Sequence, residues 1–204
     1  MKNNQKISKT EVKRYFLLAN AFKNPAKRKK ELGINGLRHE YQKLKEYFLN
    51  LKESELDEKF SDKVRLKRYN SMDWYKSEIE LEKAGVWPKM KGLDIKLTVG
   101  NVPVTTEGVK KILNGKLNLE VPKKFLIQLS SLREIAEFVY ENFPLVFYPG
   151  GEVREKDYNV WARENNQPLC NIYDFDIDDG CSRAIAYWLN GVKKAPTFFA
   201  EYKT

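Results

Sequence analysis

Residues 172–180 read I-Y-D-F-D-I-D-D-G, and large apolar side chains alternate with carboxylates along them. Tyr173, Phe175 and Ile177 recur at every second position. This is the period of a β-strand, because successive side chains of a strand point to opposite faces. We therefore predict a strand here that buries its aromatic face and carries the aspartates on the other face.

Short runs of the same kind occur on both sides of this strand. They lie at 145–148, 152–154, 159–163 and 197–202. Turn residues such as P-G-G at 149–151 divide them. Helical spacing at 132–143 and 182–189 places one helix before these runs and one among them. The C-terminal part thus predicts a small sheet with helices packed on one face.

The first half of the chain has helical patterns instead. Ser8 and Glu11 form a capping box before apolar residues that recur every three or four positions, and the same spacing returns at 37–51. We expect an α+β protein in two units. The first, 1–115, is a basic helical region with a helix-turn-helix and a hairpin, and the second, 116–204, is a small α+β domain.

Positive charge is concentrated in the first half. The 204 residues carry 37 Lys and Arg against 28 Asp and Glu, a net charge of +9. Residues 1–92 hold 23 of the basic and 13 of the acidic residues, so they account for the whole excess. Such a block attracts phosphate backbones through counterion release, although a solvated helical surface carries the same charge. Two clusters are candidate phosphate contacts: Lys27, Arg28, Lys29 and Lys30, and Lys63, Arg65, Lys67 and Arg68.

Several classes of protein are excluded by what the sequence lacks. No run reaches the roughly 18 apolar residues of a membrane helix and no secretory segment opens the chain, so we expect a cytoplasmic protein that does not bind membranes. Cys170 and Cys181 are too few for a disulfide framework or a four-cysteine zinc site. Because His39 is the only histidine, mechanisms that need two histidines are excluded as well.

The stretch 61–105 carries the most organised local signal. It predicts a short capped helix over 63–69, a turn at 70–71, a longer helix over 72–84 and a hairpin over 95–105. This order of elements, with S-M-D-W-Y-K-S-E-I-E-L-E-K-A-G-V-W around the longer helix, resembles the winged helix-turn-helix DNA-binding proteins.

The resemblance implies a mode of DNA binding. In that family the exposed face of the longer helix enters the major groove and the hairpin touches phosphates. Lys76 and Lys83 would then lie nearest to the bases, with Lys89 and Lys91 around the hairpin. Three glutamates on the same helix would be repelled by phosphates, so the alternative is a helix that packs inside or faces a protein.

The aspartates of the opening strand raise the question of a metal site. Asp174 and Asp176 would lie on one side of the strand, roughly 7 Å apart between α-carbons, and convergent carboxylates hold Mg²⁺ or Mn²⁺ in phosphoryl transfer. The D-F-D run also resembles the first metal motif of archaeo-eukaryotic primases and polymerases, which implies the same two ligands. That group has a histidine and a third aspartate downstream, and neither follows Asp179 here. Solvated carboxylates, a helix cap, or pairing with the basic half are the alternatives that we favour.

We therefore expect a non-enzymatic nucleic-acid-binding protein without a cofactor, such as a regulator or an accessory replication factor of a mobile element. The first alternative is a protein-interaction module that inhibits a nucleic-acid-handling machine. The second alternative is a metal-dependent nucleotidyl or phosphoryl transfer enzyme built on Asp174 and Asp176.

Overall fold

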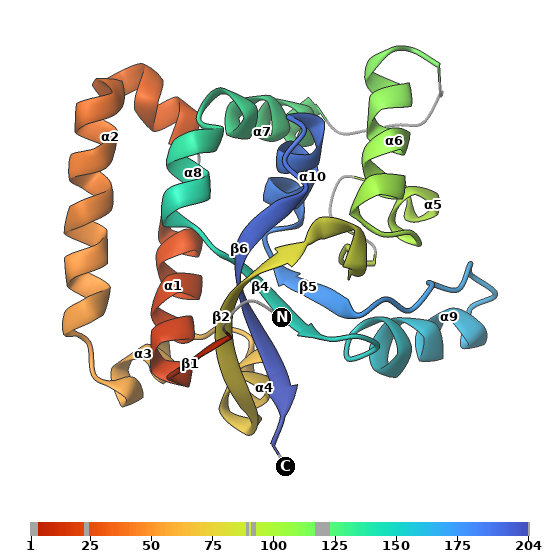
Figure 1. Ribbon diagram of the computed structural model, residues 1–204, viewed down its shortest axis with the longest axis horizontal. Helices are drawn as coiled ribbons and strands as arrows, with labels where there is room; N and C mark the ends of the chain where they lie inside the picture. Colours follow the sequence, from red (N-terminus) through yellow and green to blue (C-terminus); the bar gives the residue numbers. More distant parts are fainter. Residues whose placement is uncertain (1–3, 23–24, 89, 91–92, 117–122, 204) are drawn as a thin grey trace.

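A mixed sheet stands at the centre of the computed structural model, which describes residues 4–22, 25–88, 90, 93–116 and 123–203 (Figure 1). Its strands follow the order β1-β2-β6-β4-β5-β3. They are β1 (Gln5–Ile7), β2 (Met72–Glu80), β3 (Ala84–Gly85), β4 (Leu145–Pro149), β5 (Phe175–Asp179) and β6 (Lys194–Tyr202). β2 is antiparallel to β1 and β6, β4 is parallel to β6 and antiparallel to β5, and β5 is parallel to β3.

Helices lie around this sheet, so the predicted α+β class is confirmed (Figure 1). They are α1 (Lys9–Ala21), α2 (Pro25–Asn50), α3 (Glu53–Lys59), α4 (Lys63–Ser71), α5 (Ile95–Thr98), α6 (Val102–Leu113), α7 (Lys123–Glu134), α8 (Ala136–Asn142), α9 (Val160–Glu164) and α10 (Cys181–Leu189). A 3₁₀ turn at Leu81–Lys83 links β2 to β3, and a π-helical turn at Arg154–Asn159 leads into α9.

Polar side chains start several of these helices. Ser8 accepts a hydrogen bond from the N–H of Glu11 at 3.1 Å, as the capping box predicts, and Asp62 accepts one from the N–H of Arg65 at 3.0 Å. α2 is bent at Gly33, whose φ of 68° is a left-handed value that glycine adopts without strain. The first helix and the short helix after Asp62 are therefore confirmed.

The longer helix predicted over 72–84 is wrong, because Met72–Glu80 form strand β2. This strand pairs with β6 over nine residues, from Met72↔Tyr202 to Glu80↔Lys194. Its buried side chains include Trp74, which is 1% exposed and lies in the core. Pairing with a strand far along the chain outweighs the local helical signal. Within the described residues of 61–105, α4 thus leads directly into a strand, and the reading helix implied by the winged-helix resemblance is not formed.

The hairpin predicted over 95–105 is wrong as well. The segment forms α5 and the start of α6, and Asp94 and Asn101 cap these helices with their side chains. Gly100-Asn101 was expected to reverse a hairpin, but Asn101 accepts the N–H of Val104 at 3.2 Å and so begins a helix. The same polar residues suit a turn or a helix start, and the packing of Leu97 and Val102 in the core selects the helices.

The predicted strands of the C-terminal part are confirmed in three places and wrong in two, because residues 152–154 form a turn that leads into the π-helical turn. Residues 145–148, 197–202 and most of the opening stretch lie in β4, β6 and β5. Residues 159–163 are helical, because Asn159 is held by Cys170 and Glu155 at the end of a π-helical turn. Both faces of β5 are covered, so Asp176 and Asp178 are buried along with Ile177.

Aromatic side chains from both halves of the chain fill the core. Tyr69 of α4 lies 4.9 Å from Trp74 and 6.1 Å from Tyr148 of β4, measured between ring centroids. Phe22, which follows α1, lies 5.5 Å from Phe143, which follows α8. Residues of the two predicted units, 1–115 and 116–204, thus pack in one core and contribute strands to one sheet.

Candidate nucleic-acid interface and an adjoining cavity

The first predicted phosphate-contacting cluster lies at the start of α2. Lys27 is exposed and its Nζ is 3.6 Å from Glu31, while Arg28 forms an ion pair with Glu40. Arg28 also places its guanidinium carbon 5.1 Å from the ring centroid of Phe22. Lys29 is half-buried and Lys30 is exposed. These four consecutive residues therefore lie together on about one turn of one helix.

The second predicted cluster is divided between the surface and the interior. Lys63 and Lys67 are exposed on α4. Arg65 instead donates from Nε to Asp178 at 2.9 Å, and Arg68 lies 3.1 Å from Glu152 and 2.6 Å from Asp157. These two arginines tie α4 to β5 and to the segment after β4. Ion pairs within the protein therefore occupy the guanidinium groups that were predicted to contact phosphates.

The residues predicted to lie nearest to bases are not on an α-helix. Lys76 is exposed on β2, and Lys83 ends the 3₁₀ turn with its Nζ 3.7 Å from Asp174. Lys89 and Lys91 lie outside the described residues. The start of α2 lies in the upper part of the view in Figure 1 and α4 in the lower part, and Arg65 is the member of the second cluster that reaches the cavity lined by Pro25.

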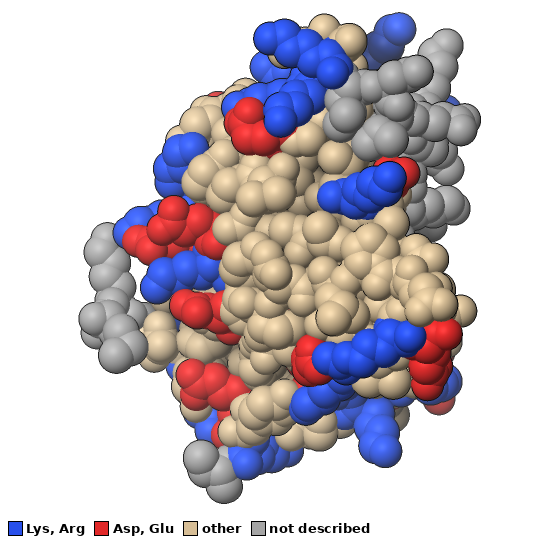
Figure 2. All heavy atoms as spheres, turned by 90° about the vertical axis from the view of Figure 1, so that its right-hand side faces the viewer, with Lys and Arg blue, Asp and Glu red and all other residues tan. Residues whose placement is uncertain are grey.

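Basic side chains alternate with acidic ones on the face that carries α5, α6 and α9. Figure 2 shows this face with Lys and Arg next to Asp and Glu around a largely uncharged centre. Lys110 pairs with Glu107 at 2.7 Å and Arg163 with Glu155 at 2.7 Å. Because the two signs neutralise each other at short range, this face attracts a polyanion weakly.

The charges of α2 are less fully paired than those of that face. The helix lies at the outer edge of the molecule and packs inward through Leu37, Tyr41 and Phe48 (Figure 1). Its sequence holds seven Lys and Arg against three Glu. Five of its basic residues have no carboxylate within 4.0 Å among the described residues. We call these five residues the α2 cations: Lys29, Lys30, Arg38, Lys43 and Lys45.

The aspartates considered as metal ligands are held in different ways. Asp174 is exposed, with 64% of its side-chain surface accessible. Asp176 is buried, and its Oδ2 accepts the N–H groups of Val153 at 2.8 Å and Arg154 at 2.9 Å. Burial raises the pKa of Asp176, and these two N–H bonds oppose the rise. One carboxylate thus faces water while the other anchors a backbone turn, and the described residues contain no group of three His, Cys, Asp or Glu suited to a metal ion.

Asp178 is paired with the basic half of the protein, as one alternative from the sequence proposed. Its Oδ1 accepts from Arg65, and its Oδ2 accepts the Tyr69 hydroxyl at 2.7 Å. Burial raises the pKa of Asp178, and the positive charge of Arg65 opposes the rise. The hydroxyl and the guanidinium satisfy both oxygens, which makes this carboxylate a structural partner of α4.

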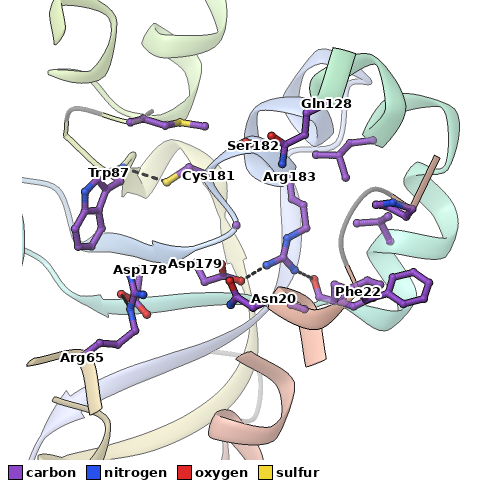
Figure 3. Close-up of a pocket in the computed structure, with 17 residues that line it drawn as sticks. Asn20, Phe22, Arg65, Trp87, Gln128, Asp178, Asp179, Cys181, Ser182 and Arg183 are labelled. Atoms are coloured by element: carbon purple, nitrogen blue, oxygen red, sulfur yellow. Dashed lines mark hydrogen bonds and ion pairs between the residues drawn. The ribbon is translucent and has the colours of Figure 1, made fainter. Parts of the chain in front are cut away.

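A cavity of about 680 Å³ adjoins Asp178 and the start of α2. Figure 3 shows Trp87 and Phe22 toward opposite sides of it, with Asp179 and Arg183 between them. Gly180, at a φ of 102°, turns the chain from β5 into α10 and so brings Ser182 to the wall. The other lining residues are Ala19, Asn20, Pro25, Arg65, Met90, Gln128, Leu132, Val139, Phe143, Asp178 and Cys181.

The groups of the cavity wall are held in fixed positions. Arg183 donates to the carbonyl oxygens of Phe143 at 2.6 Å and Pro144 at 3.1 Å and pairs with Asp179. Cys181 accepts the backbone N–H of Trp87 at 3.1 Å. Burial raises the pKa of Cys181 to about 12, so the protonated thiol is the form at neutral pH, and this cysteine is no nucleophile.

Sequence reasoning missed the cavity and most of its wall. The Asp179–Arg183 pair joins the last residue of β5 to the first turn of α10, so only its short separation in the sequence could have indicated it. The Arg65–Asp178 pair joins residues far apart in the chain, and no local pattern indicates it. Arg154, which is fully buried, also lies in a segment predicted to be extended.

Comparison of the chain with protein-family models, with curated proteins and with solved structures gives no significant match. None of the helices in the described part of the chain is long and apolar enough to cross a membrane.

Proposed function

We propose that the protein binds nucleic acid through phosphate contacts of the α2 cations, as a regulator or an accessory factor without chemistry of its own. One observation carries this proposal. Five cations of one outer helix have no carboxylate partner among the described residues, whereas Arg65 and Arg68 pair inside the protein. Unpaired cations release counterions from a phosphate backbone when they bind it, and this release drives association.

The geometry favours backbone contacts over the reading of bases. β2 takes the place of the predicted recognition helix, and the α2 cations sit on both flanks of α2 rather than along one narrow ridge. Long flexible side chains in such positions reach phosphates but do not select a base sequence. Cys170 and Cys181 are both free thiols, in keeping with the cytoplasm as the compartment.

The test is a fluorescence-anisotropy titration with labelled duplex DNA, single-stranded DNA and RNA at low and higher salt. The first variant combines Lys30→Gln, Arg38→Gln and Lys43→Gln, which are exposed residues of α2. The matched control combines Lys63→Gln, Lys67→Gln and Lys76→Gln, which removes the same charge from α4 and β2. Both variants keep the core intact, so their folding should equal that of the wild type.

We expect wild-type binding to weaken with salt and the α2 variant to bind more weakly with a flatter salt dependence. Removal of three phosphate contacts should reduce the slope of log affinity against log salt by about 2.7 for a duplex. The control variant should keep most of the wild-type slope. Equal losses in the two variants, or no binding by the wild type at low salt, would refute the proposal and favour docking to an acidic protein surface.

A further inference from the structure

The cavity at the start of α2 has the size and the wall of a small-molecule site. Its volume of about 680 Å³ lies within the range of roughly 300–1,000 Å³ that ligand sites occupy. The half-buried Trp87 supplies flat apolar surface on one side, and Phe22, which is 3% exposed, closes the other side (Figure 3). Asn20, Gln128 and Ser182 supply amide and hydroxyl groups that both donate and accept hydrogen bonds. Such a wall suits a flat ligand with a polar edge.

The charge of the cavity wall indicates whether a charged or a neutral ligand fits it. Two arginines line it, and each is already paired with an aspartate of the same wall: Arg65 with Asp178, and Arg183 with Asp179. A phosphate placed here would face two carboxylates along with the two guanidinium groups. The wall is therefore close to neutral, and it suits a neutral polar group better than an anion.

The cations that suit phosphates begin just outside the cavity. Pro25 lines the cavity and is the first residue of α2. Lys29 and Lys30 follow within two helical turns, about 6 to 8 Å along the axis at 1.5 Å per residue. Arg28 lies over Phe22, a wall residue. A ligand with a neutral flat part and an anionic part would thus place the first in the cavity and the second along α2.

We infer that the cavity holds a nucleobase, either an unstacked base of a single strand or the base of a free nucleotide. This inference rests on the proposed function, because α2 would hold the phosphates of the same ligand. Trp87 offers an aromatic surface of the kind that proteins stack on unpaired bases, with the Arg65 guanidinium carbon 5.8 Å from its ring centroid. Asn20, Gln128 and Ser182 would supply hydrogen bonds to the edge of the base.

The test compares strands with and without bases. The probes are a labelled single-stranded DNA, an abasic strand of equal length and phosphate number, and adenosine and cytidine monophosphates. The variants are Trp87→Leu, which removes the aromatic surface, and Trp87→Phe, which retains one. Trp161→Leu is the matched control, because this tryptophan lies on α9 and is not part of the cavity wall. Thermal melts establish that each variant is folded.

We expect wild-type protein to prefer the base-bearing strand by about tenfold, the change that stacking of one base produces. Trp87→Leu should remove this preference, while Trp87→Phe and Trp161→Leu should keep most of it. The α2 variant should weaken both strands alike and leave the ratio unchanged. Equal binding of both strands by the wild type would overturn the inference and leave the phosphate contacts of α2 standing.

The two proposals can also fail separately in the other direction. If neither strand binds, the proposed function fails. The nucleoside monophosphates then test by themselves whether the cavity binds a base. Saturable binding of a monophosphate that Trp87→Leu abolishes would support the base site. Absence of such binding would overturn it.

Discussion

The buried side chain of Arg154 donates hydrogen bonds to several separate backbone segments. It is 0% exposed, and its nearest carboxylate oxygen, on Asp176, is 3.9 Å away. Its guanidinium donates at 2.5 to 3.3 Å to the carbonyl oxygens of Val86, Thr98, Val99, Gly100 and Asn171. Gly85 makes room for it, since a Cβ there would lie 2.3 Å from Nε. One charged group thus holds the segment after β3, α5 and the approach to β5.

Arg154→Lys should lower the free energy of unfolding by about 3–5 kcal/mol, because lysine keeps the charge but leaves several buried carbonyl oxygens without a donor. Urea denaturation measures the change. The matched control is Arg163→Lys, an exposed residue paired with Glu155, which should stay within about 0.5 kcal/mol of the wild type. Equal denaturation midpoints for the two variants would show that the carbonyl contacts of Arg154 are not needed for stability.

A second set of charges, centred on the buried Lys13, joins α1 to α3. Lys13 is 0% exposed, and its Nζ lies 2.9 Å from Glu53 and 2.5 Å from Asp57. Thr10 donates to Glu53 at 3.0 Å. The hydrogen bond from Lys13 is the main cause that lowers the pKa of Glu53 from 4.5 to about 2. α3 is therefore held on α1 by an ion pair as well as by Leu56.

The lowered pKa of Glu53 predicts a loss of stability in acid. Its contribution is complete above pH 4.5 and disappears as the pH falls toward about 2, because the unfolded chain takes up the proton first. Asp176 and Asp178 act in the opposite sense, since their raised pKa values favour protonation of the folded state. Glu53→Gln should therefore melt at a lower temperature than the wild type at neutral pH.

The difference in melting temperature between Glu53→Gln and the wild type should shrink as the pH falls through this window. Thermal melts followed by circular dichroism at several pH values measure it. Glu58→Gln, an exposed change on the same helix, serves as the control and should track the wild type throughout. If the difference in melting temperature stays constant down to about pH 2, the charge of Glu53 does not contribute to stability through its ion pair with Lys13.

The whole molecule is organised by strands that come from both halves of the chain. β1, β2 and β3 belong to 1–115, and β4, β5 and β6 belong to 116–204. In the sheet these strands are interleaved, with β6 paired to β2 and β5 paired to β3. Each half alone would leave long strand edges and aromatic core side chains in water.

Separate fragments 1–115 and 116–204 should therefore lack a cooperative thermal transition, although each carries helical sequence. Circular dichroism and one-dimensional proton spectra of each fragment, and of the two mixed, provide the measurement. The intact chain is the control. Native-like dispersion in either isolated fragment would show that the halves fold independently and that their shared sheet forms afterwards.

Much of the local structure could be predicted from neighbouring residues. Ser8 and Asp62 cap helices because a cap needs only a side-chain oxygen and an N–H three residues later. The apolar runs at 145–148 and 197–202 form strands, and the excess of basic residues in the first half is a property of composition. The α+β class follows from these patterns alone.

Contacts between distant residues decided the rest. Met72–Glu80 has the capped, amphipathic pattern of a helix, yet nine-residue pairing with β6 and burial of Trp74 make it a strand. Arg65 and Asp178 both looked like surface charges until the packing of α4 on β5 joined them. The cavity wall likewise comes from α1, α2, α4, α7, α8 and α10 together with β5. Such pairings depend on free energies of burial and strand register, which neighbouring residues along the chain do not specify.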